Sequence, residues 1–139
     1  MQTETLHQQQ YLATTAILNY QDDSIQALIR SRDWKALSDY ERIGAVYNFV
    51  RDEIAFGYNV GDAISASDVL RDGYGQCNTK TTLCMALLRS LGIPTRFRGL
   101  TIHKQLQKGA VTGLWYQIAP AEIIHSWAEV WYILRGFYS

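Results

Sequence analysis

The sequence predicts an α+β fold in which helices come first along the chain and an antiparallel sheet follows. Apolar residues recur at helical spacing over 39–54 and again over 78–91, so both segments should be core-facing helices. Residues 124–134 are instead dense in Trp, Val, Tyr and Ile, which favour strands. Because the helical and strand segments are grouped along the chain, the strands should pair antiparallel.

Two further helical segments are expected before residue 39. Residues 8–20 carry a weak helical pattern. Asp22 then offers an N-cap oxygen to a short helix that contains Ile25 and Ile29. These segments should pack as an N-terminal helical part of the domain.

Start and stop signals define the helices that follow. Ser38 and Glu41 have the spacing of a capping box, which predicts the start of the 39–54 helix. Residues 65–70 read as one more turn of helix, and Gly73 should end it.

The helix predicted at 78–91 should be buried on several sides, because apolar residues cover most of its circumference. Pro94 prevents it from continuing. Residues 96–102 then alternate partly and are predicted as a strand. The segment 103–123 that follows is rich in loop residues, with a short strand expected near Trp115.

Length and composition describe an ordinary globular protein. The chain has 139 residues, of which 47% are hydrophobic and 19% charged, and we expect one domain over 1–139. Thirteen Lys and Arg balance thirteen Asp and Glu without a basic cluster, so there is no electrostatic case for nucleic acid or an anionic membrane. Without a signal-peptide pattern or an apolar run of membrane-spanning length, the sequence predicts a cytoplasmic protein of open oligomeric state.

The two cysteines have to be explained separately. In a helix, Cys77 and Cys84 are two turns or about 10 Å apart, whereas a disulfide needs Cα atoms within about 7 Å. No CxxC or HxxxH spacing occurs, so the sequence predicts no metal and no other cofactor. Cys84 lies among Met and Leu and is predicted to be a buried, inert thiol.

Cys77 is a candidate nucleophile. It stands at the first turn of the predicted buried helix, where free N–H groups and the helix dipole stabilise a thiolate. A cysteine nucleophile also needs a base. His125, near the start of the last predicted strand, is the histidine that a rigid strand could hold beside the sulfur. His7 and His103 lie in a tail and a loop.

Each of these residues also has a simpler interpretation. Cys77 can be a small packed residue, and His125 a core or surface group. Glu129 is expected on the same strand face as His125, where it either orients the imidazole or forms a structural ion pair. Lys80 is predicted to be a helix-surface charge or the partner of a nearby acid.

Several ordered motifs resemble the transglutaminase-like superfamily. Residues 73–96, with Gly-Tyr-Gly-Gln-Cys leading to Cys77, resemble its cysteine segment, and residues 125–130 resemble its histidine segment. Residues 49–54 and 66–70 match the helices that usually precede the cysteine. The resemblance extends over about residues 40 to 139.

The resemblance implies a papain-like core, with 38–139 as the catalytic part and 1–37 as an N-terminal helical segment. It implies acyl transfer on an amide through a thioester at Cys77, with His125 as the base. The product is an acid (protease, amidase or deamidase) or a new amide (transglutaminase). The Cys77 backbone amide, and Gln76, are the implied oxyanion donors. The implied partner is a protein or peptide amide.

The third catalytic residue of the family is an acid on the strand after the histidine strand. Residues 135–139 resemble the turn that leads into that strand, so we expect the acid to lie past Ser139, in a longer protein. The other explanation is a domain that works without the acid or does not catalyse. Glu129 is a substitute candidate.

The walls of a cleft would set substrate specificity. Trp115 and Tyr116 in the loop-rich segment, and Tyr58 and Asn59 before the cysteine segment, are the candidates. Aromatic residues at these positions can equally belong to the core. Two other functional classes stay open: a non-catalytic peptide-binding module that keeps the fold, and a structural α+β domain whose cysteines are merely packed.

Overall fold

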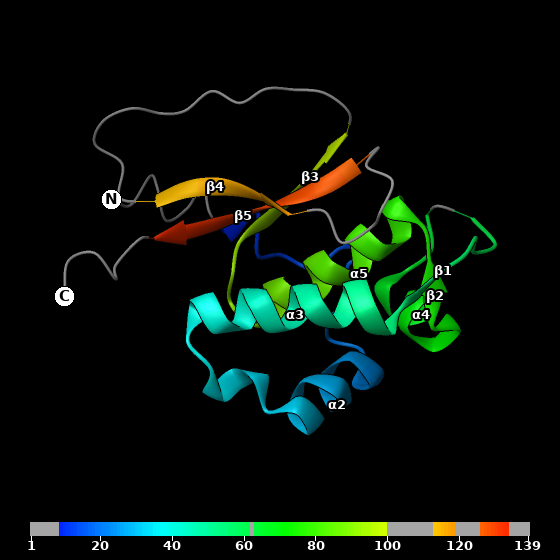
Figure 1. Ribbon diagram of the computed structural model, residues 1–139, viewed down its shortest axis with the longest axis horizontal. Helices are drawn as coiled ribbons and strands as arrows, with labels where there is room; N and C mark the ends of the chain where they lie inside the picture. The colour runs from blue at the N-terminus through cyan, green and yellow to red at the C-terminus, as the bar shows by residue number, and fades with distance from the viewer. Residues whose placement is uncertain (1–8, 62, 100–112, 119–125, 134–139) are drawn as a thin grey trace.

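The computed structural model describes residues 9–61, 63–99, 113–118 and 126–133 of the chain. The α+β prediction is confirmed: the helices cover one face of a three-stranded antiparallel sheet (Figure 1). The elements are α2 (Asp23–Arg32), the 3-10 turn η1 (Trp34–Ala36), α3 (Asp39–Glu53), β1 (Ala55–Phe56), α4 (Ala66–Asp72), β2 (Tyr74–Gly75), α5 (Cys77–Ser90), β3 (Thr95–Gly99), β4 (Gly113–Ile118) and β5 (Ser126–Ile133). In the described part of the chain, no helix has the length and apolar character needed to cross a membrane.

The sheet has the order β3-β5-β4, with both neighbours antiparallel to β5. Val130 lies at the centre, opposite Thr95 on one side and Tyr116 on the other. Ala128 and Val130 are buried and belong to the hydrophobic core, and α5 contacts both β5 and β3. The expected last strand is therefore the middle strand of the sheet, and it carries the sheet's contact with the central helix.

The predicted helix starts are confirmed by their caps. Ser38 and Glu41 form a capping box, with Ser38 N–H donating to Glu41 Oε1 (3.0 Å) and Glu41 N–H donating to Ser38 Oγ (3.2 Å). Asp22 accepts from the backbone at the start of α2, and Ser65 does so for α4. Gly73 ends α4 with a positive φ of 76°, a conformation that few other residues adopt without strain.

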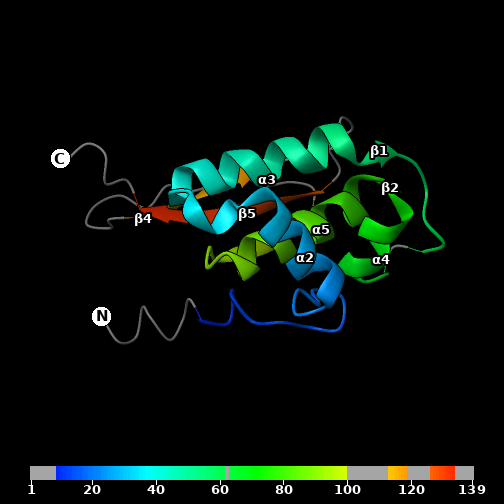
Figure 2. The same ribbon diagram turned by 90° about the horizontal axis from the view of Figure 1, so that it is seen from below.

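Helix α5 is the centre of the core. Twelve of its 14 residues are buried, so it packs on all sides, as its sequence predicts. It lies between α3 and the sheet, and α2 forms a further layer beyond them (Figure 1 and Figure 2). Because burying one Leu side chain contributes about 1.5–3 kcal/mol, this helix supplies a large part of the folding free energy.

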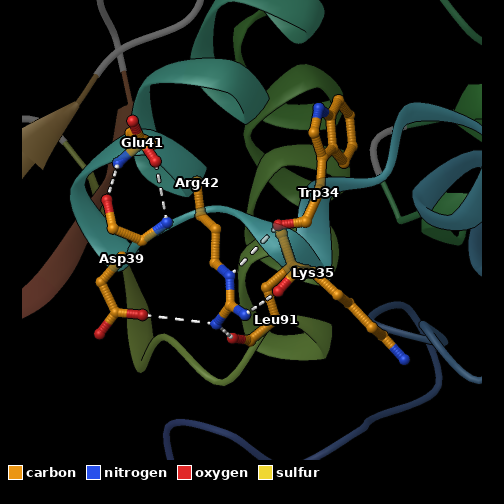
Figure 3. Close-up of polar contacts among 7 residues, drawn as sticks. Trp34, Lys35, Asp39, Glu41, Arg42 and Leu91 are labelled. Atoms are coloured by element: carbon orange, nitrogen blue, oxygen red, sulfur yellow. Dashed lines mark hydrogen bonds and ion pairs between the residues drawn. The ribbon is translucent and has the colours of Figure 1, made fainter.

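The C-terminal end of α5 is held by Arg42 of α3. Its guanidinium donates to the carbonyl of Leu91 (3.0 Å) and to the carbonyls of Trp34 and Lys35 in η1, and it lies 3.4 Å from a carboxylate oxygen of Asp39 (Figure 3). One side chain thus connects the start of α3, the turn before it and the end of the central helix.

The helix predicted over residues 8–20 is wrong for residues 10–20, which form turns and irregular structure, and of the described residues in that range only Gln9 is helical. The carbonyls of Tyr11 and Ala13 accept from Thr95 N–H (3.0 Å) and Arg89 Nη1 (2.7 Å) instead of from the next helical turn. Thr15 Oγ1 accepts from Leu18 N–H, a local bond that competes with helix formation. The segment is therefore bound to the end of α5 and the start of β3.

The expectation that strands pair only antiparallel is wrong in one place: β1 and β2, which the sequence did not predict, form a separate parallel two-stranded sheet among the helices, with Ala55 opposite Tyr74. The strands that the sequence did predict are found within the described residues. The strand expected at 96–102 is β3, which begins one residue earlier, and residues 100–102 lie outside the described part. The short strand expected near Trp115 is β4, six residues long.

Candidate active site

The first residue of α5 and the first residue of β5 lie at the same end of the molecule. After α5 ends, a short turn at 91–94 leads into β3, which runs back along the helix. Because β5 is antiparallel to β3, β5 runs in the same direction as α5. Cys77 and Ser126, the starting residues of the two elements, are therefore at one end (Figure 1 and Figure 2).

His125 lies outside the described residues, so its pairing with Cys77 stays a prediction. Its neighbour along the chain, Ser126, is the first residue of β5 and is paired with Gly99. Cys77 begins α5 one residue earlier than the helix predicted from the sequence. The residue is buried, with 8% of its surface exposed.

The backbone before Cys77 is fixed by a capping box that the sequence did not reveal. Gln76 is the N-cap of α5: its Oε1 accepts from Asn78 N–H (2.9 Å), and its own N–H donates to Thr79 Oγ1 (3.0 Å). The pattern Gln-x-x-Thr reverses the usual order of the capping box, and Gln is an uncommon N-cap. The oxyanion roles of Gln76 and of the Cys77 amide stay predictions.

The first turn of α5 carries no negative charge of its own. It contains no acidic residue, so no carboxylate of its own competes for the positive end of the helix dipole. The residues that cap it, Gln76 and Thr79, are neutral. A thiolate at Cys77 would be the anion closest to these N–H groups along the helix.

Close packing against α5, and not only the turn, requires a glycine at position 75. A Cβ at this position would lie 2.6 Å from Thr79 Oγ1 and 3.1 Å from Lys80 Cγ. The short strand β2 therefore passes so close to α5 that only glycine fits. Its pairing with β1 sets Phe56 opposite Gly75, and the Gly57 N–H donates to the Gly75 carbonyl (2.9 Å).

Asn59, predicted as a substrate contact, has its carboxamide bound to the protein's own groups. Thr79 Oγ1 donates to Asn59 Oδ1 (2.7 Å). Asn59 Nδ2 donates to Asp72 Oδ2 (2.9 Å) and to the Tyr74 carbonyl (2.9 Å). The loop after β1 is thereby connected to α4, β2 and α5.

The other predicted substrate contacts are spread over two regions. Tyr58 is 77% exposed and stacks edge-on against Phe56, with ring centroids 5.5 Å apart. Tyr116 of β4 packs partly buried against the hydrophobic core. The Trp115 side chain lies outside the described part. Phe56 and Tyr74, on the paired strands β1 and β2, are further exposed aromatic residues that the sequence analysis did not single out.

Of the two roles predicted for Lys80, the helix-surface charge is wrong, whereas the partner of a nearby acid agrees with its effect on Asp52. Lys80 is 5% exposed, and its Nζ donates to the carbonyl of Arg51 in the last turn of α3 (3.5 Å). A cation at a helix C-terminus is electrostatically favourable. The ion pair with Arg51 is the main cause that lowers the pKa of Asp52, and the charge of Lys80 adds to it.

The remaining predictions concern Cys84 and Glu129. Cys84 is fully buried, and burial raises the pKa of its thiol to about 12. Both cysteines are free, as expected. Glu129 forms an ion pair with Arg96 across the strands (2.7 Å), which is the structural use considered for it. Among the residues described, no cluster of three or more His, Cys, Asp or Glu could hold a metal ion.

Comparison with known proteins gives one family and one fold. The model of the transglutaminase-like superfamily matches residues 26–139. A solved structure described as a putative cysteine protease from Cytophaga hutchinsonii is similar, with 20% identity and a TM-score of 0.61. The match covers 88% of this chain and 39% of that one, so the chain spans about two fifths of that protein's length. No curated protein matches in sequence.

Proposed function

The chain belongs to the transglutaminase-like superfamily, and we propose on that premise that it carries out cysteine-dependent acyl transfer on an amide. Cys77 is the nucleophile and His125 the base in this proposal. The observation that supports it best is the common end at which α5 begins with Cys77 and β5 begins with Ser126, directly after His125. The substrate is a protein or peptide amide.

The chemistry proceeds in two steps. The thiolate of Cys77 attacks the amide carbonyl carbon, the C–N bond breaks, and the amine leaves with a proton from the His125 imidazolium. Water then attacks the thioester while His125 takes one of its protons. The C–S bond breaks, the acid leaves, and the thiolate and imidazolium are restored.

We favour hydrolysis over transamidation. The structural neighbour is described as a putative cysteine protease, which supports water as the acceptor of the acyl group. The neutral capping groups at the start of α5 support the thiolate itself, because they leave the helix dipole uncompensated beside Cys77. An amine that competes with water would give transamidation at the same thioester.

Alkylation with iodoacetamide at neutral pH tests the nucleophile. Peptide mass spectrometry reads Cys77 and Cys84 separately in folded protein. We expect Cys77 to react while Cys84 stays protected, and His125→Ala to slow the Cys77 reaction about tenfold or more. A Cys77 that labels as slowly as Cys84, or that ignores the His125 substitution, would contradict the proposal.

Turnover needs its own assay. Folded protein is incubated with casein, and new amines are counted against a Cys77→Ala control. We expect amine release that the control lacks. If peptide binding is found without turnover, and Cys77→Ala keeps it, the chain is a binding module instead.

A further inference from the structure

We infer that Asn59 is a positioning residue, which holds the start of α5, and with it Cys77, in a single register. The inference rests on the proposed function, because the register of Cys77 has a chemical consequence only if its thiol reacts. Asn59 lies in the loop after β1, 20 residues before Thr79, its partner on the helix.

The three hydrogen bonds of Asn59 join the segments that surround the helix start. Its Oδ1 accepts from Thr79 in the first turn of α5 (2.7 Å). Its Nδ2 donates to Asp72 at the end of α4 and to the carbonyl of Tyr74 in β2, both at 2.9 Å. Since β2 is followed by Gln76 and then Cys77, Asn59 binds the chain both before and after the nucleophile.

The bond between Asn59 and Thr79 fixes the direction of the Thr79 hydroxyl. A hydroxyl has one proton, and two acceptors lie within reach of it: Asn59 Oδ1 at 2.7 Å and the Gln76 carbonyl at 3.4 Å. The shorter bond directs the proton to Asn59. A lone pair of the hydroxyl is then available to accept from the Gln76 N–H at 3.0 Å. Asn59 thereby determines the cap that immediately precedes Cys77.

Close packing keeps this arrangement from shifting. A Cβ at Gly75 would meet Thr79 Oγ1 at 2.6 Å, and a Cβ at Gly57 would meet the Tyr74 ring at 3.0 Å. The backbone of β2 at Gly75 and the backbone at Gly57 after β1 therefore have little room to move. Interiors packed in this way transmit small displacements rather than absorbing them.

An amide is the side chain that this position requires. It donates and accepts at once, and it is neutral. An aspartate would keep the acceptor for Thr79, but it would lose both donated bonds and face the carboxylate of Asp72. It would also bring a negative charge toward the helix start, in competition with a thiolate at Cys77.

The test measures how strongly Cys77 depends on His125. The rate of Cys77 alkylation by iodoacetamide is compared with and without His125→Ala, in the wild-type background and in Asn59→Ala and Thr79→Val backgrounds. We expect the His125 effect, about tenfold or more in the wild type, to fall at least threefold in both variants. Asn59→Asp should behave like Asn59→Ala.

Two substitutions on the same helix provide matched controls. Thr79→Ser keeps the hydroxyl and should retain the His125 effect. Thr81→Val makes the same chemical change as Thr79→Val, but the Thr81 hydroxyl is buried without a hydrogen-bond partner in the part of the chain that the structure describes. It should leave the His125 effect unchanged.

The outcomes separate this inference from the proposed function. A residue that only stabilises the fold would change unfolding, which the labelling of buried Cys84 reports in the same molecule, and this rate is subtracted from that of Cys77. If the His125 effect is large and equal in all backgrounds, Asn59 does not position Cys77 and the inference is overturned. If wild-type Cys77 shows no His125 effect, the proposed function fails, and the inference fails with it.

Discussion

The two ends of helix α5 are held by different chemistry. At the C-terminal end, the guanidinium groups of Arg42 and Arg89 bind backbone carbonyls. At the N-terminal end, the neutral side chains of Gln76, Thr79 and Asn59 bind one another and the backbone. Cations compensate the negative end of the helix dipole, whereas neutral caps leave its positive end available. The difference indicates that one end serves stability and the other is suited to an anion.

Arg89, in the last turn of α5, is a buried side chain that binds two other segments of the chain. It is 7% exposed, and it donates to Thr95 Oγ1 (3.0 Å), the Thr95 carbonyl (2.7 Å) and the Ala13 carbonyl (2.7 Å). Burial lowers the pKa of its guanidinium, which remains charged at neutral pH. This one side chain connects the central helix, the sheet and the N-terminal segment.

The largest expected effect comes from Cys77→Ala, which removes the chemistry of the N-terminal end. Loss of a nucleophile lowers kcat by a factor on the order of 10⁶ in a comparable hydrolase, so amine release from casein should fall to background. The free energy of unfolding, measured by urea denaturation, should change by only about 1 kcal/mol. Residual turnover well above background would show that the thiol is not the nucleophile.

Arg89→Met should remove the contacts that hold the C-terminal end of α5 and leave the reactivity of Cys77 at its N-terminal end unchanged. The substitution leaves two carbonyls without their charged donor, and we expect a loss of about 3 kcal/mol in the free energy of unfolding. Urea denaturation measures this loss. Cys77 alkylation, followed in folded protein, should stay within about twofold of wild type. A parallel loss of Cys77 reactivity would mean that the two ends are coupled through the helix.

Gly75→Ala should disturb the N-terminal end by crowding it. The added methyl would meet Thr79 Oγ1 at 2.6 Å, so the capping box has to move, at an expected cost of about 1–3 kcal/mol. Denaturation measures the cost, and the His125 dependence of Cys77 alkylation should fall as well. Gly44→Ala is the control, because a Cβ there meets nothing within 4 Å. Equal effects of the two substitutions would refute the crowding explanation.

The last prediction concerns the pH dependence of stability that the buried Cys84 thiol of α5 should cause. Burial raises the pKa of Cys84 from 9.0 to about 12, so between these values the unfolded chain loses a proton that the folded protein keeps. Stability from this group is complete below pH 9 and is lost as the pH rises toward 12, with a slope of up to about 1.4 kcal/mol per unit. Cys84→Ala should remove that slope, which denaturation between pH 9 and 11 can measure. An unchanged slope would assign the alkaline loss to other groups.

Features that depend on local signals can be predicted from the amino-acid sequence. Ser38 and Glu41 form a capping box within four residues. The spacing of the apolar residues over 78–91 predicts a helix that is buried on several sides. The density of β-formers over 124–134 identified the central strand. Cys77 and His125 are predicted in the same way, because each lies in a short motif that resembles one of the family, and their pairing stays a prediction.

Features whose hydrogen-bond partners lie far apart in the sequence could not be predicted from it and are seen first in the packed structure. Asn59 meets Thr79 across 20 residues, and Arg89 meets Ala13 across 76. Residues 10–20 are not helical, and the carbonyls of Tyr11 and Ala13 accept from Thr95 and Arg89 instead. Lys80 is buried, and its Nζ donates to the Arg51 carbonyl in the last turn of α3. A pattern in the sequence records what a residue prefers, but which donor reaches which acceptor depends on how the elements pack.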